Sequence, residues 1–256
     1  MHDQIEAVAV AAAEAGAAEL RRRYRAGDDE ADFGAHDVTA EADEAAEARM
    51  LPLVRRAFPG HAVFAEEAGT FPGEGFRWIV DPLDGTNDFA VGLPTFASSV
   101  AVEDDDGPLV AAVALPATGE TYVARRGEGV RYDGERVAAE SDVPLAASTA
   151  VVVTGRDVHR DPERDARADA IRAALDDRVK GIKNSWAPTV HSGLFARGRI
   201  DALVQFHPDE EEQAVTELLA REAGAAVRRE GPLYLAATDE DRRDALWDPV
   251  AAAARR

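Results

Sequence analysis

One short segment, residues 77 to 89, constrains this chain more than any other. It reads Arg-Trp-Ile-Val-Asp-Pro-Leu-Asp-Gly-Thr-Asn-Asp-Phe, so an apolar run of strand-forming residues ends at Asp81 and Asp84. The intervening proline fixes φ, and the following glycine permits a tight reversal that turns both carboxylates to one side. Two carboxylates this close repel each other unless a cation lies between them. Oxygen ligands favour Mg²⁺, Mn²⁺ or Ca²⁺ over zinc, so the segment predicts a metal site; the alternative is an ordinary surface turn.

A second short strand that ends in acid precedes this one. Residues 62 to 67 read Ala-Val-Phe-Ala-Glu-Glu. If the two strands are neighbours, three or four carboxylates meet at one edge of a sheet. Acids in such a place cost stability unless they are paired or bind a metal, which favours Glu66 as a ligand. We expect Glu67 to support the site through hydrogen bonds.

The order and spacing of these motifs resemble those of the inositol monophosphatase superfamily. Its Asp-Pro-[Ile/Leu]-Asp-Gly-Thr signature matches residues 81 to 86. Further matches at about the family's spacing are Phe89, Gly92, Pro94, Ser98, and the segments 37 to 43, 198 to 201 and 222 to 224. The resemblance covers most of the chain. It implies a mixed α+β and α/β chain folded as a layered α-β-α-β-α sandwich, and a Mg²⁺-dependent phosphatase that acts on a small phosphomonoester.

The resemblance also implies a site with two or three Mg²⁺ ions, for which Mn²⁺ is a possible substitute. The ligands implied for the first ion are Glu66, Asp81 and the backbone carbonyl of Leu83. Those implied for the second ion are Asp81, Asp84 and an acid from the second half of the chain. Metal ions would neutralise the phosphoryl oxygens and activate the attacking water.

Thr86, beside Glu66, would orient the attacking water, with Asp43 supporting that network or a third ion. Each has a structural alternative, because Thr86 also suits a helix cap and Asp43 suits the first turn of a helix. The residues that the resemblance places near substrate are Asp84, Gly85, Thr86, Ser185 and Gln205.

The second half departs from the family pattern at the remaining metal ligand. Relatives carry Trp-Asp ten residues before Glu-Ala-Gly-Gly, and counting back from Glu222 reaches Glu212, preceded by Glu211. We predict Glu212 as the ligand because this alignment needs no gap. Asp209, one helical turn earlier, is the alternative. The run of acids at 209 to 212 also suits the start of a helix.

Other positions bear on the substrate. Gln205 stands where inositol-specific relatives often carry an acid, which weakens the case for inositol itself. Lys180 and Lys183 could bind a distal phosphate or be ordinary surface residues. We therefore expect inositol monophosphate, fructose 1,6-bisphosphate (as in archaeal-type bisphosphatases) or both as substrate. The alternatives are a 3′-phosphonucleotide phosphatase and a catalytically degenerate homologue that binds a metabolite or a protein.

The composition limits partners and surroundings. The 256 residues include no cysteine, which excludes disulfides and thiol nucleophiles, and no apolar run reaches a membrane span. The formal net charge is −20, with Lys180 and Lys183 as the two lysines. This pattern is typical of a halophile's protein in molar salt, and it offers no basic stripe for nucleic acid. We expect a cytoplasmic protein without a membrane partner; the resemblance implies a homodimer.

Hydrophobic periodicity divides the chain into an α+β half, residues 1–145, and an α/β half, residues 146–256. Helices are predicted over 3–24 and 40–57, followed by a hairpin meander over 97–138. In the second half, helices are predicted near 161–176, 186–197, 209–223 and 239–255. Strands are predicted near 150–153, 178–182, 199–206 and 225–236.

Overall fold

Apolar strands from the first half of the chain build a mixed eight-stranded sheet. The computed structural model describes residues 1–27, 31–33, 38–184 and 186–255. The strand order is β10-β9-β8-β7-β6-β5-β3-β4, and only the β3–β5 pair is parallel. The bounds are β3 (Ala62–Ala65), β4 (Gly69–Phe71), β5 (Arg77–Asp84), β6 (Ala97–Asp104), β7 (Gly107–Ala114), β8 (Thr121–Arg125), β9 (Gly129–Tyr132) and β10 (Glu135–Val137). The predicted meander over 97–138 is therefore confirmed.

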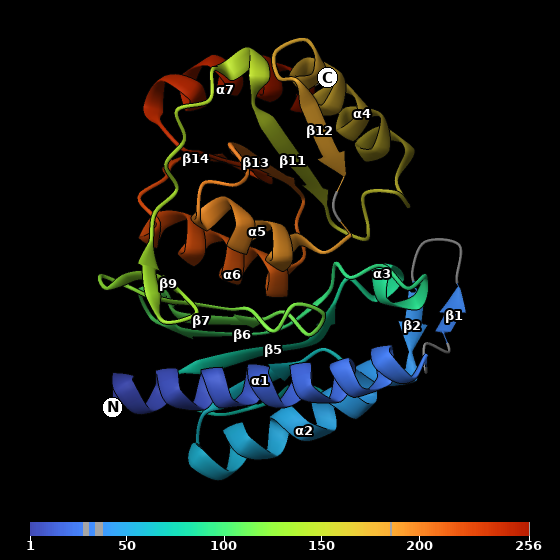
Figure 1. Cartoon of the computed structure of the whole chain (residues 1–256), viewed down its shortest axis with the longest axis vertical. Helices are drawn as coiled ribbons and strands as arrows, with labels where there is room; N and C mark the ends of the chain where they lie inside the picture. Colours follow the sequence, from blue (N-terminus) through green and yellow to red (C-terminus); the bar gives the residue numbers. More distant parts are fainter. Residues whose placement is uncertain (28–30, 34–37, 185, 256) are drawn as a thin grey trace.

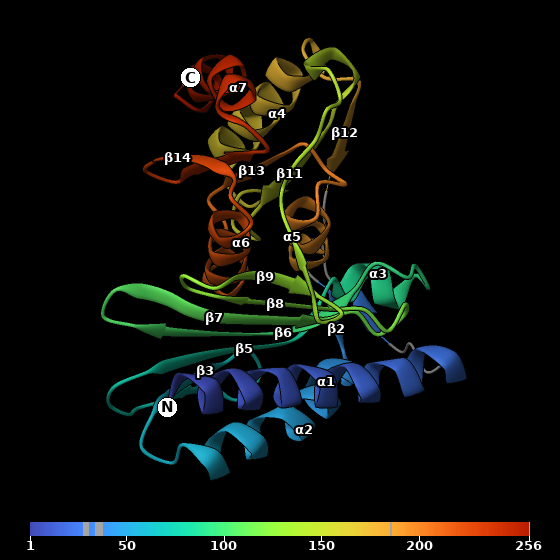
Figure 2. The same ribbon diagram turned by 60° about the vertical axis from the view of Figure 1, so that its left-hand side comes forward.

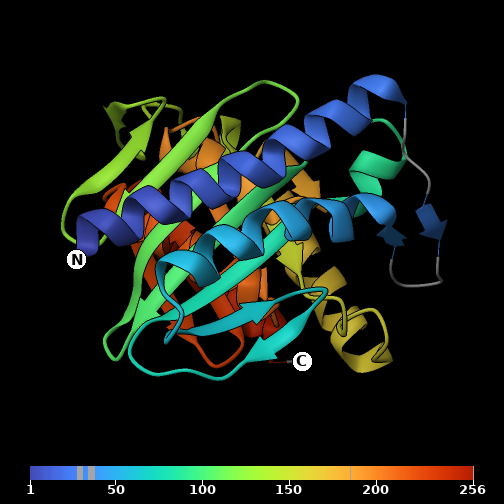
Figure 3. The same ribbon diagram turned by 90° about the horizontal axis from the view of Figure 1, so that it is seen from below.

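Two long helices cover one face of this sheet, as Figures 2 and 3 show. They are α1 (His2–Ala26) and α2 (Glu41–Ala57), close to the predicted ranges. Their small and aliphatic side chains pack with the sheet around Trp78 and Val100. Gly27, in the left-handed conformation, ends α1 after a basic last turn, as the macrodipole favours. A separate antiparallel pair, β1 (Ala31–Phe33) and β2 (Val38–Ala40), follows α1.

The second half forms a five-stranded sheet with helices on both faces (Figure 1). Its strands, in spatial order, are β12 (Gly181–Asn184), β11 (Thr149–Thr154), β13 (Ala202–Phe206), β15 (Leu233–Ala237) and β14 (Ala226–Glu230). The helices α5 (Pro188–Ala196) and α6 (Glu210–Glu222) lie between the two sheets, and α4 (Pro162–Asp176) and α7 (Glu240–Ala254) cover the outer face. The short helices are α3 (Thr86–Ala90) and η1 (Leu145–Ala147). This five-layer arrangement confirms the predicted α-β-α-β-α sandwich.

One predicted strand was wrong. Residues 225–236 form an antiparallel hairpin of β14 and β15, in which Arg228 pairs with Leu235. Gly231, with φ of 56°, allows the reversal, and Pro232 follows it. The apolar residues after the turn, residues 233 to 235, made the segment resemble a single strand. The strand predicted near 178–182 lies slightly later, at Gly181–Asn184.

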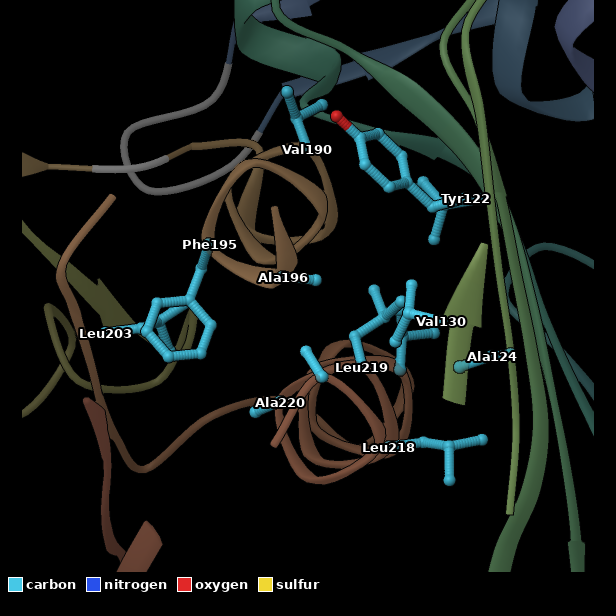
Figure 4. Packing of buried hydrophobic residues seen from close by; sticks show 14 of the residues in the cluster. Tyr122, Ala124, Val130, Val190, Phe195, Ala196, Leu203, Leu218, Leu219 and Ala220 are labelled. Carbon is cyan, nitrogen blue, oxygen red and sulfur yellow. The ribbon is translucent and has the colours of Figure 1, made fainter. Parts of the chain in front are cut away.

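The central helices join the two sheets through one apolar core, shown in Figure 4. Leu218 and Leu219 of α6 lie toward Val130 of the first sheet, whereas Phe195 of α5 lies toward Leu203 of the second. The carboxylate of Glu222, the last residue of α6, accepts the backbone amides of Gly127 and Gly129 at the β8–β9 turn. This shared layer holds α5 and α6 against the first sheet. The division at residue 145 stays a prediction.

No helix within the described ranges combines the length and the apolar character that crossing a bilayer requires.

Candidate active site

The end of β5 places two aspartates in the protein interior. Asp81 pairs with Ser99 and Asp84 with Ala97, so β5 carries an extra residue between them and bulges. The two residues are 3% and 5% exposed. Gly85 then turns the chain at φ 87°, where a Cβ atom would lie 2.8 Å from the Thr95 carbonyl oxygen and 2.9 Å from Ala187 Cβ. Both the backbone conformation and the available space therefore require glycine.

Thr86 and Asp43 meet beside this turn. The Thr86 hydroxyl lies 3.1 Å from Asp43 Oδ1 and 3.0 Å from the Leu83 carbonyl oxygen, and it can donate to either. Asp43 is buried in the first turn of α2, so it also fits the alternative role of an acid that stabilises the start of this helix. The structure thus brings together three groups that the sequence predicted to be neighbours.

Asp84 connects the first sheet to the start of α5. Its Oδ2 accepts the backbone amide of Thr189 at 2.9 Å and the Thr189 hydroxyl at 2.5 Å. Burial raises the pKa of Asp84 to about 7, although the hydrogen bonds from Thr189 and Val190 favour the charged form and limit this rise. Asp84 therefore has a structural role in addition to its predicted metal role.

Two acids carry a buried oxygen without a hydrogen-bond partner in the described part of the chain. Asp81 Oδ1 and Glu212 Oε2 each lack a hydrogen-bond partner among the described residues. Burial raises the pKa of Asp81 well above its usual range, and the nearby charges of Glu66, Asp84, Glu211 and Glu212 add to this. Burial also raises the pKa of Glu212, and the nearby charge of Asp84 raises this pKa further. Acids from β5, from the start of α6 and from the residue after β3 therefore repel one another.

Arg156 supplies positive charge to one side of this cluster. It follows β11, and its Nη1 lies 2.7 Å from Glu66 Oε1 while its Nη2 lies 2.5 Å from Glu211 Oε1. Its Nε donates to Asp209 Oδ2 at 3.3 Å, and its backbone amide donates to the same oxygen at 3.0 Å. Asp209 is thus occupied at the N-cap of α6, whereas Glu212 faces the buried acids. This difference supports Glu212 over Asp209 as the predicted ligand.

The donor set suits a hard divalent cation. Asp81 and Glu212 each have one buried oxygen without a hydrogen-bond partner from the described residues, and Mg²⁺ or Mn²⁺ would satisfy such oxygens. Across the described ranges, however, no three acidic or histidine side chains converge closely enough to hold an ion as they stand. Glu66 is turned toward Arg156 instead. The residues therefore fit the metal by chemistry, and binding requires side chains to move.

The other predicted site residues have different surroundings. The Glu67 amide donates to Glu47, which also accepts the Ala68 amide and so fixes the turn after Glu66. Gln205 is 0% exposed, and its side-chain amide donates to the Thr216 hydroxyl at 3.2 Å. This placement does not support contact between Gln205 and substrate, which stays a prediction. Ser185 lies outside the described residues.

A pocket of about 200 Å³ lies where β11 and β12 end, and residues of α4 complete its lining. Thr154 and Trp186 line it; Thr154 is two residues before Arg156, and Trp186 is three residues before Thr189. Trp186 is 54% exposed and stacks on His159 with ring centroids 6.2 Å apart. His159 lies within hydrogen-bond distance of Thr154 and Asp165. The pocket therefore offers an exposed aromatic face at the ends of these two strands.

Sequence reasoning missed the residues of the second half of the chain that contact the acids. Arg156 had one usable signal, since it follows an apolar strand in an acid-rich chain. Thr189 had none, because its contact with Asp84 depends on how α5 packs against the first sheet. Glu211 was noted only as a replacement for tryptophan, yet it is buried and paired with Arg156.

Comparison with known proteins identifies the fold family. A family model described as the inositol monophosphatase family matches residues 1–252. The chain belongs to this family. A relative named Nus factor SuhB, from Pseudomonas aeruginosa, is 34% identical over 204 residues, which are 75% of this chain and 72% of the relative.

Solved structures agree with this fold. The extragenic suppressor protein suhB from Bartonella henselae matches with a TM-score of 0.85 and 24% identity, over 95% of this chain and 98% of that one. An inositol monophosphatase from Anabaena matches with a TM-score of 0.80 and 23% identity, over 95% and 94%. At these identities, this likeness shows the fold.

Proposed function

We propose that this member of the inositol monophosphatase family is a Mg²⁺-dependent phosphatase of small phosphomonoesters, acting on inositol monophosphate, fructose 1,6-bisphosphate or both. The observation that carries the proposal is the buried Asp81 carboxylate. It has an unsatisfied oxygen and is surrounded by the charges of four other acids. A bound cation would pair with that oxygen and offset the repulsion among the acids. Membership of the inositol monophosphatase family supports phosphate ester hydrolysis as the reaction.

The residues proposed to hold the ions are Glu66, Asp81, Asp84, Glu212 and the carbonyl of Leu83. Bound Mg²⁺ would neutralise phosphoryl oxygens, lower the pKa of water and stabilise the leaving oxygen. The Thr86 hydroxyl donates toward Asp43 or Leu83, so its own oxygen remains available to accept a hydrogen bond from water. Thr86 would thereby orient the attacking water. No covalent intermediate on the protein is needed.

Asp84→Asn tests this proposal. The asparagine oxygen can still accept from Thr189, so the fold should persist while a metal-binding charge is lost. We expect phosphate release in Mg²⁺ and molar KCl to fall below about a tenth of the wild-type rate. Asp105→Asn, in the exposed β6–β7 turn, is the matched control and should be silent. Asp84→Asn protein that melts as a folded chain and retains more activity than this contradicts the ligand set.

A 3′-phosphonucleotide phosphatase is the second candidate, favoured by the pocket where β11 and β12 end. Trp186 exposes an aromatic face on which a nucleobase can stack. Trp186→Ala should raise KM for a 3′-phosphonucleotide and leave KM for sugar phosphates unchanged. Equal effects on both substrates would remove the support for this candidate.

A catalytically degenerate binding protein is the third candidate. The names of the SuhB relatives describe a factor and a suppressor protein, and Glu212 replaces the family's usual aspartate. A screen of phosphorylated sugars, polyols and nucleotides in Mg²⁺ and molar KCl separates the cases. Phosphate release supports an enzyme, whereas ligand-induced stabilisation without release supports a binding protein.

The surroundings and partners are also proposals. The net charge of −20 supports a halophilic, cytoplasmic protein that does not bind nucleic acid. Family membership supports a homodimer. Light scattering in molar KCl tests the oligomeric state, and titration with labelled RNA tests the absence of nucleic-acid binding.

A further inference from the structure

Arg156 holds three carboxylates from two distant segments of the chain. All three nitrogens of its guanidinium are engaged, with Glu66 after β3 and with Asp209 and Glu211 at the start of α6. The planar guanidinium suits this role because it presents several donors in one fixed arrangement. Arg156 therefore bridges the edge of the first sheet and the central helix layer.

The charge of Arg156 is matched to the cluster that it borders. Glu66 and Glu211, which it contacts, are also among the acids whose charges act on buried Asp81. An arginine stays protonated, so it supplies positive charge at every working pH. Its side chain is 40% exposed, so the guanidinium can move toward solvent without breaking the apolar core. The contact with Glu66 is thus both favourable and reversible.

We propose that Arg156 determines the metal affinity of this site by acting as an internal cation in the metal-free protein. Glu66 leaves Arg156 when it takes up its proposed metal-binding position, so each binding event breaks this ion pair. The inference rests on the proposed function for the identity of the ion. It explains why the acids do not converge around an ion in this arrangement, although their chemistry suits one.

The simpler role for Arg156 is to fasten β11 to α6. In that case its removal destabilises the metal-free and metal-loaded proteins equally and leaves metal affinity unchanged. An internal cation has a different consequence. Its loss exposes the acids to their mutual repulsion in the metal-free protein, and it strengthens metal binding.

Arg156→Gln distinguishes these roles by direct titration with Mn²⁺ and Mg²⁺, without substrate, at fixed molar KCl. We expect the melting temperature of the metal-free protein to fall and metal affinity to rise by roughly tenfold, the equivalent of about 1.4 kcal/mol. The rise in melting temperature on adding metal should be correspondingly larger than in the wild type. Unchanged or weaker metal affinity overturns the inference.

Arg77→Gln is the matched control. Arg77 forms a bidentate pair with Glu210, in the same first turn of α6 but outside the acid cluster. Its loss should lower stability and leave metal affinity unchanged. An equal gain in affinity for Arg77→Gln shows a general charge effect and overturns the specific role of Arg156.

Arg156→Lys provides a second variant that retains the charge. Lysine lacks the guanidinium fork and cannot hold all three carboxylates in the same way, so metal affinity should lie between wild type and Arg156→Gln. Affinity equal to the wild type in both Arg156 variants overturns the inference even if phosphate is released. Absence of phosphate release from a wild-type protein that binds metal overturns the proposed function instead.

Discussion

The buried Asp84 carboxyl makes the metal-free protein less stable as pH rises. Its pKa is about 7 in the folded chain, against 3.8 for an unperturbed aspartate. The folded state therefore binds more protons than the unfolded state between these values. By linkage, the free energy of unfolding is highest below this window and falls as pH rises through it.

The magnitude follows from the shift. At about 1.4 kcal/mol per pKa unit, titrating this single group between pH 5 and pH 8 lowers the free energy of unfolding by about 2.5 kcal/mol. For a chain of this size that loss corresponds to a fall in melting temperature of roughly 5 to 10 °C. Asp81 and Glu212 shift in the same direction and add to the total.

The difference between wild type and Asp84→Asn isolates the contribution of Asp84. Asparagine does not titrate, so the stability profile of the variant should be flatter by about 2.5 kcal/mol between pH 5 and pH 8. Urea denaturation in molar KCl with a chelator measures both profiles. Added Mg²⁺ should abolish the fall in the wild type, because a bound cation favours the charged carboxylates. Parallel profiles for the two proteins, or wild-type stability that rises with pH without metal, would refute the reasoning.

Two further predictions concern the metal ligand and the surface charge. Glu212→Gln should strongly weaken activation by Mg²⁺, whereas Asp209→Asn should cost mainly stability, about 1 kcal/mol, because Asp209 accepts from Arg156. Loss of Mg²⁺ activation in Asp209→Asn alone would show that the gapless alignment is wrong. Glu212→Asp should tighten Mg²⁺ binding if the shorter side chain gives better octahedral geometry. Because of the charge of −20, the melting temperature should rise steeply from dilute to molar KCl, and a melt insensitive to salt would reject the halophilic hypothesis.

Local sequence patterns predicted the layers well, since each layer depends on periodicity within one segment. The helices α1, α2, α4, α6 and α7 begin and end within two residues of their predicted limits. The β14–β15 hairpin was missed because Gly231 and Pro232 interrupt a run that is apolar at its end, and pairing across that turn is a tertiary property. Turn geometry, rather than composition, decides such cases.

The site shows the same division between local and tertiary information. The motif at residues 81 to 86 placed Leu83 and Thr86 together, and the resemblance to the family placed Asp43, in the first turn of α2, beside them. It could not place Arg156 or Thr189, since their contacts depend on how the second sheet and its helices pack against the first. Gln205 shows the limit of alignment, because a family position suggested substrate contact, whereas the structure buries this side chain, and the contact stays a prediction.

The acid cluster draws on segments far apart in the chain, from Glu66 to Glu212, and this orders its assembly during synthesis. Asp81 and Asp84 leave the ribosome long before Thr189, Glu212 and the rest of the central helix layer. A nascent chain that has completed β10 therefore contains two closely spaced aspartates without the hydrogen bonds that Thr189 will supply, beside a sheet face still exposed to water. The helices α5 and α6 then cover that face and bring the donors of Thr189 and the carboxylate of Glu212, so a nascent chain cannot assemble the whole cluster until α6 has been synthesised.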